Sequence, residues 1–237
     1  MAGSTLRIMA PSGDRLALYL ADEAPVRAVA TNVRFVGGAY SRGFQIGSRG
    51  YHDFVRKHVI KAASTDRFVV KGRETVVAAT ADGNTTIVTL LERYHELMTV
   101  FSGPAPSRET LIGLFGTLEI QDHPRGMRVR PERFTQGDTA LQQTAVTVAD
   151  RGTIVVPGPR QARRMVPKHR GKSTRHGELW RVPLPGRSAD SASEHDYLYV
   201  VAGAKGAAEI RIDPGSRLDA SALLTWVDGI DAAWTAA

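Results

Sequence analysis

Cysteine is absent from the 237-residue chain, and no run of apolar residues approaches the length of a membrane-spanning helix. The first absence excludes a disulfide framework, a thiolate metal site and a cysteine nucleophile. The second argues against a membrane partner. The apolar run at 16–20 is too short for the core of a signal peptide, and Asp14 and Asp22 flank it. The sequence therefore predicts a cytoplasmic globular protein.

Acidic residues are scarce in one segment of the chain. Residues 151–181 contain nine Arg or Lys but one acid, Glu178, so this segment carries a charge of +8. The whole chain has 31 bases and 24 acids, which leaves 22 bases and 23 acids, a charge of −1, for the other residues. The basic character of the protein belongs to this segment, and a concentrated basic patch indicates contact with an anionic partner.

The apolar pattern of residues 87–120 recurs at 199–232, after a shift of 112 positions without a gap. Each copy predicts a strand, a tight turn, a second strand, a loop and an amphipathic helix. Ser107 and Asp219 fall at equivalent positions before the two helices, where a side-chain oxygen can cap the first turn. Unrelated strand–strand–helix units share such a pattern, so coincidence stays open as an alternative. The shift also places Ile87 and Val88 on Tyr199 and Val200, Met98 and Val100 on Ile210 and Ile212, Leu111 and Ile112 on Leu223 and Leu224, Phe115 on Val227, and Leu118 on Ile230.

The repeat predicts an α+β protein with two similar antiparallel-sheet-plus-helix domains in tandem, a pseudo-duplication. We place the domains at residues 1–130 and 141–237, with a linker at 131–140, because turn-forming residues interrupt the pattern there. The chain is long enough for two modest cores. Helical spacing of apolar residues also predicts a helix over 50–62.

One part of the chain resembles a known family. The stretch 100–104, a capped helix through Leu111 and Phe115, and the strands 118–120 and 127–129 are similar to the closing half of a PsbP-like domain, of the kind found in small actinobacterial proteins of the LpqN type. The resemblance covers about a quarter of the chain. It implies a curved antiparallel sheet backed by helices, and a protein that acts by binding rather than by catalysis.

Motifs for catalysis or for cofactor binding are incomplete. The run 171–174 (Gly-Lys-Ser-Thr) lacks the first glycine of a phosphate-binding loop, since Val166 stands there, and a strand is predicted after it instead of a helix. The surroundings of Ser41 lack the first glycine of a nucleophile elbow. His52 and His58 are six residues apart on the predicted helix, hence on different faces. We predict no catalytic residue, no metal site and no cofactor.

The strongest candidate site is the basic segment at 160–175, which lacks apolar periodicity and is predicted to be an exposed loop. Clustered guanidinium and ammonium groups bind phosphates by charge-assisted hydrogen bonds and by counterion release. Trp180 is the single aromatic side chain nearby that could stack on a base. No helix-turn-helix, zinc or RNP pattern, with which proteins read the base sequence of a nucleic acid, is present. The predicted anion-binding residues are Arg160, Arg163, Arg164, Lys168, Arg170, Lys172 and Arg175.

Two functions follow as hypotheses. The first is a non-catalytic binding or assembly protein whose basic loop engages an anionic macromolecule, either a nucleic-acid backbone or an acidic protein surface. A homo-oligomer or a larger assembly is compatible with it. The alternative is an enzyme with a small-molecule pocket between the two sheets, using carboxylates or histidines that the sequence does not single out. It also stays open that the charges only keep a long loop soluble.

Overall fold

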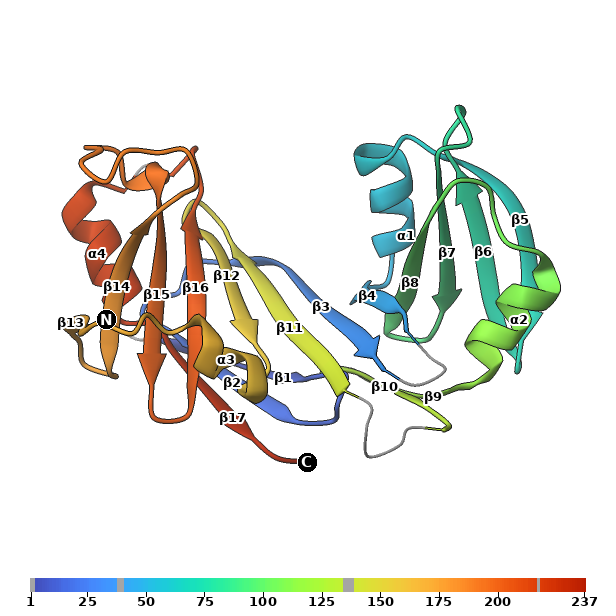
Figure 1. Ribbon diagram of the computed structural model, residues 1–237, viewed down its shortest axis with the longest axis horizontal. Coiled ribbons are helices and arrows are strands. Elements are labelled where there is room, and N and C mark those ends of the chain that lie inside the picture. Colours follow the sequence, from blue (N-terminus) through green and yellow to red (C-terminus); the bar gives the residue numbers. More distant parts are fainter. Residues whose placement is uncertain (1–2, 38–40, 134–138, 217) are drawn as a thin grey trace. The chain divides into compact units, whose positions relative to one another are not determined.

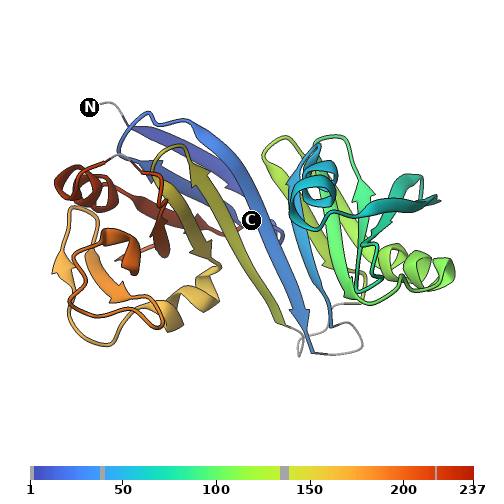
Figure 2. The ribbon, with the colours of Figure 1, turned by 90° about the horizontal axis from the view of Figure 1, so that it is seen from above.

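The computed structural model describes residues 3–37, 41–133, 139–216 and 218–237, which form a mixed α+β structure with antiparallel strand pairs (Figures 1 and 2). No helix formed by these residues is long and apolar enough to cross a bilayer. The chain divides into two compact units, and both take residues from distant parts of the sequence. Unit 1 contains Met1–Ile8, Asp14–Val29 and Gln143–Ala237, and unit 2 contains Met9–Gly13 and Ala30–Gln142.

Unit 1 contains strands in the order β13-β14-β15-β16-β12-β11, with β11 included from Gln143 onward, and a separate three-stranded sheet with the order β1-β2-β17. Alternate strand residues and one face of α4 form its core, in which Leu18, Tyr199, Ile210 and Val227 are completely buried. The elements are β1 (Ser4–Met9), β2 (Arg15–Leu20), β11 (Thr139–Val148), β12 (Gly152–Pro157), α3 (Pro159–Met165), β13 (Lys172–Ser173), β14 (Glu178–Pro183), η2 (Glu194–Asp196), β15 (Tyr197–Gly203), β16 (Gly206–Ile212), α4 (Ala220–Asp228) and β17 (Asp231–Thr235).

Unit 2 contains the strands β3-β4-β8-β7-β6-β5 in that order, with β3 included from Ala30 onward, and a separate β9-β10 hairpin. Its main core includes Phe44 and Phe115, whose rings meet edge to face, together with Met127 and Val129 of the hairpin. The predicted helix over 50–62 is confirmed at Tyr51–Val59, where an α-helical turn continues as a π-helix. The elements are β3 (Val26–Val36), β4 (Gly43–Ser48), α1 (Tyr51–Phe54), η1 (Val55–Val59), β5 (Ala63–Val70), β6 (Arg73–Ala79), β7 (Thr85–Leu91), β8 (His95–Ser102), α2 (Arg108–Gly116), β9 (Leu118–His123) and β10 (Gly126–Pro131).

The units do not coincide with the predicted domains 1–130 and 141–237. Strand β2, placed in the N-terminal domain by the sequence, pairs with β17, where Leu18 lies opposite Ala232. Within the predicted linker 131–140, residues 134–138 lie outside the described residues, whereas Pro131 ends strand β10. A turn in the sequence predicts an interruption of the chain, but it cannot show which distant strand completes a sheet.

The two repeated segments have the predicted order of elements, and both helix caps are present. Ser107 Oγ accepts the Thr110 amide proton at 3.3 Å, and Asp219 Oδ1 accepts that of Ala222 at 2.8 Å. The ungapped match fails at the second strand, because Ile87 pairs with Val100 whereas Tyr199 pairs with Ile210.

This difference in register has a simple cause. Four residues separate the paired Leu91 and Glu96, whereas two separate the paired Gly203 and Gly206. A shift of two residues keeps the same side chains on the same face of the sheet, which is why the apolar pattern conceals it.

Candidate anion-binding surface

The first three predicted cations lie on a helix, not in a loop. Helix α3 begins with Pro159, which suits the first helical position because its missing amide proton has no acceptor there. The helix packs against β12 and β16, and Ala162 is its buried residue. Arg163 and Arg164 are exposed in its last turn. The prediction of a loop is wrong here, because one buried alanine suffices to seat two turns and leaves no apolar periodicity.

The remaining four cations follow α3 in the chain: Lys168 and Arg170 lie on the segment that leads to β13, Lys172 lies in β13, and Arg175 lies between β13 and β14 (Figure 1). Trp180 fixes this segment: its Nε1 donates to the His169 carbonyl oxygen at 2.8 Å, and the side chain is buried. A Cβ atom added to Gly171 would lie 2.7 Å from the Trp180 ring, so only glycine fits at this contact. The Gly171 amide donates to Glu178 Oε2 at 3.1 Å. The cations are therefore carried by backbone that is attached to the sheet.

The seven predicted cations are exposed, and among the described residues none of them has an ion-pair partner. The two other bases of the segment are paired: Arg151 with Asp22 at 3.0 Å and Arg181 with Glu194 at 3.1 Å. The single acid of the segment, Glu178, accepts the Gly171 amide proton. The structure thus places the predicted residues on unit 1, without an ion pair to any acid that it describes. We call this the α3–β13 basic surface; it consists of Arg160, Arg163, Arg164, Lys168, Arg170, Lys172 and Arg175.

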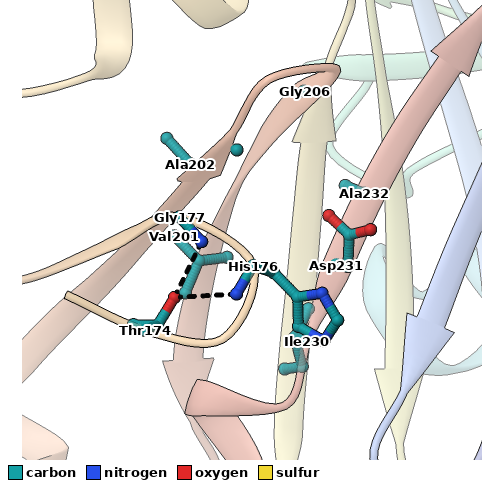
Figure 3. A pocket seen from close by; sticks show the side chains of 10 residues that line it. Thr174, His176, Gly177, Val201, Ala202, Gly206, Ile230, Asp231 and Ala232 are labelled. Carbon is teal, nitrogen blue, oxygen red and sulfur yellow. Dashed lines mark hydrogen bonds between the residues drawn. The ribbon is translucent and has the colours of Figure 1, made fainter.

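A small hollow lies beside the end of this surface (Figure 3). Thr174 Oγ1 accepts the amide protons of His176 and Gly177 at 3.3 and 3.0 Å, and Asp231 lines the same hollow. His176 Nε2 is buried and has no hydrogen-bond partner among the described residues. The cavity volume of about 10 Å³ is enough for about one water molecule and is far below the roughly 300–1,000 Å³ typical of ligand pockets. The hollow is therefore too small to be a substrate pocket.

A histidine–carboxylate pair in unit 2 escaped the sequence analysis. His95 Nδ1 lies 2.7 Å from Asp122 Oδ1, and Asp122 Oδ2 accepts the Tyr94 amide proton at 2.6 Å. The two residues are 27 positions apart, so no local spacing could have indicated the contact. The carboxylate orients the imidazole, but among the described residues no hydroxyl is hydrogen-bonded to its other nitrogen. The pair therefore lacks the nucleophile that a hydrolytic triad requires.

A buried histidine, His52, joins α1 to the sheet of unit 2. Its Nδ1 lies 2.9 Å from Thr89 Oγ1, and its Nε2 is buried without a partner among the described residues. Burial lowers the pKa of His52 below its ordinary 6.5, and the nearby Glu96 carboxylate opposes this effect. The neutral imidazole is thus the form that fits the folded protein.

Acidification below pH 6.5 is expected to destabilise the fold through His52. Below pH 6.5 His52 is protonated in the unfolded chain but stays neutral in the folded protein. The stability that the neutral His52 contributes is therefore present above pH 6.5 and is lost as the pH falls toward the lowered pKa. The slope is at most about 1.4 kcal/mol per pH unit, the value for a full difference of one bound proton. Urea unfolding at several pH values should show a shallower slope for His52→Gln, while the exposed control His169→Gln retains it. Equal slopes for wild type and His52→Gln would contradict this.

No group of three or more metal-binding side chains is present among the described residues. Comparison with known proteins adds no further assignment, because no family model, curated protein or solved structure matches the chain.

Proposed function

We propose that this protein is a non-catalytic binding or assembly protein of the cytoplasm, which engages an anionic macromolecule through the α3–β13 basic surface. The observation that carries the proposal is the charge state of that surface. Seven exposed cations lie on one attached segment, and no described acid pairs with them. Arg151 and Arg181, which lie before and after these seven cations in the sequence, do have acidic partners. Solubility requires exposed charge but no fixed placement of it, whereas these cations are carried by a helix and by backbone that Trp180 fixes.

We also propose that the chain arose by duplication of one PsbP-like domain. Replacing β5-β6-β7-β8-β4-β3 by β13-β14-β15-β16-β12-β11 keeps both the order along the chain and the order in the sheet. The small sheets agree as well, because Val129 pairs with Ile120 in one and Leu18 pairs with Ala232 in the other. Val129 and Leu18 are 111 positions apart in the sequence, and Ile120 and Ala232 are 112 positions apart. In this proposal β2 and β10 are equivalent strands that the two repeats have exchanged.

The proposed function predicts binding to at least one polyanion at low salt. We expect the wild-type protein to bind labelled DNA or poly-glutamate in fluorescence anisotropy, and the triple variant Arg163→Ala, Arg164→Ala, Arg170→Ala to bind more weakly. The matched control Arg7→Ala, Arg15→Ala, Arg125→Ala removes three exposed arginines elsewhere, none ion-paired among the described residues. It should bind like the wild type. Failure of the wild type to bind any polyanion would overturn the proposed function.

A further inference from the structure

We infer that the anionic partner is a double-stranded nucleic acid, held by its phosphate backbones without regard to base sequence. This inference rests on the proposed function and adds the class of partner. Three features of the α3–β13 basic surface support it. Among its described residues there is no exposed aromatic ring and no exposed large apolar side chain, and its length suits a duplex.

The aromatic side chains argue against a single strand. Proteins that bind single strands stack the bases on exposed aromatic rings beside a basic groove. Trp180, the ring that the sequence places near the cations, is 6% exposed, and its Nε1 is used by the His169 carbonyl oxygen. Among the described residues at 158–181, no Phe, Tyr or Trp ring is exposed. A duplex, whose bases are already stacked on each other, does not need such a ring.

The apolar side chains argue against an acidic protein partner. Protein interfaces owe most of their affinity to a few apolar or aromatic anchors buried at the centre. Six large hydrophobic side chains are exposed in the described part of the chain, and all of them lie outside the basic surface. Backbone binding needs no such anchor, because phosphate contacts and counterion release supply the affinity. The six residues are Val36, Phe54, Val59, Val69, Val100 and Ile112.

The length of the surface matches a short stretch of duplex. The basic surface extends from α3, which packs against β12 and β16, to β13. In the sheet order β13 is three positions from β16 and four from β12. At about 4.8 Å per position this is roughly 14–19 Å. A duplex carries one charge per about 1.7 Å of its axis, counting both strands, so roughly five phosphates on its near side face this length. Seven cations are enough to contact that number.

The test is a salt series on a short random-sequence DNA duplex, on its separated single strand and on poly-glutamate. With about five phosphates contacted, log K for the duplex should fall with log salt at a slope near −4.5. That slope is an affinity loss of about 500-fold between about 50 and 200 mM salt. The Arg163, Arg164, Arg170 triple variant should have a slope of about −1.8, and the Arg7, Arg15, Arg125 control should retain the wild-type slope. A second duplex of different sequence should bind equally well.

The outcomes separate this inference from the proposed function. Tighter binding to the single strand or to poly-glutamate than to the duplex would overturn the duplex assignment and leave the proposed function standing. A triple variant that keeps the full duplex slope would also overturn the assignment, because the site would then lie elsewhere. Circular dichroism of both variants shows whether each is folded, and the single variant Arg163→Ala, with a slope flatter by about one unit, replaces the triple variant if that does not fold.

Discussion

Two fragments made by cutting the chain between Pro124 and Arg125 are expected to fold only in each other's presence. The cut lies in the turn between β9 and β10, where both residues are exposed and the ladder bonds on either side remain intact. Fragment 1–124 carries β1 to β9, and fragment 125–237 carries β10 to β17. Each compact unit needs strands from both fragments.

The size of the missing core determines this expectation. Without fragment 1–124, unit 1 loses Leu16, Leu18 and Leu20, which are at most 1% exposed. Burial of one such side chain contributes about 1.5–3 kcal/mol, so the three together approach the 5–15 kcal/mol that stabilises a typical domain. Without fragment 125–237, unit 2 loses Met127 and Val129, which are as deeply buried. Neither remainder has enough stability to spare.

Size-exclusion chromatography with light scattering should therefore show a 1:1 complex of the two fragments with a mass near 25.7 kDa. Each fragment alone should show no cooperative urea transition. Leu18→Ser in the first fragment should prevent assembly, whereas Arg15→Ser, an exposed position on the same strand, should not. A cooperative transition for both fragments in isolation would mean that each fragment contains a complete domain, in agreement with the tandem arrangement predicted from the sequence.

Local features of this fold were predictable because local sequence determines them. Leu16, Leu18 and Leu20 alternate with a period of two, which is the pattern of a half-buried strand such as β2, and the capping side chains of Ser107 and Asp219 marked the starts of α2 and α4. The pairing of β2 with β17 was not predictable, since it joins residues more than 200 positions apart and depends on which core accepts the strand. The exchange of strands therefore lay beyond pattern analysis.

The basic surface was predictable in composition but not in form. Charge is a sum over residues, so the excess at 160–175 is visible without any structure. Helix α3 was missed because its single buried side chain, Ala162, gives no periodic signal. The role of Trp180 was also missed, since an aromatic beside cations can stack on a base or be buried beneath a loop, and only the hydrogen bond to His169 decides between them.

Substitution of Glu96 by alanine is expected to destabilise unit 2 strongly, with a loss of about 2–3 kcal/mol in the free energy of unfolding. The carboxylate is 3% exposed and accepts the amide protons of Gly50 and His52 at 2.9 and 2.6 Å. These amides belong to the first turn of α1, which has no other cap. Alanine leaves the buried His52 amide and the partly exposed Gly50 amide without this acceptor, and it removes the negative charge that stabilises the helix N-terminus.

Urea unfolding near neutral pH measures this loss, and Glu119→Ala provides the matched control. Glu119 forms an ion pair with Arg130 at 2.6 Å, but both side chains are about half exposed, so its removal should cost less than about 1 kcal/mol. Glu96→Gln keeps one acceptor oxygen and should fall between the two. Because Glu96 raises the pKa of His52, the glutamine variant should also titrate His52 at lower pH in an NMR series. If Glu96→Ala costs no more stability than Glu119→Ala, the Glu96 carboxylate does not anchor α1. Hydrogen-exchange rates of the Gly50 and His52 amide protons that are the same in Glu96→Ala as in the wild type would lead to the same conclusion.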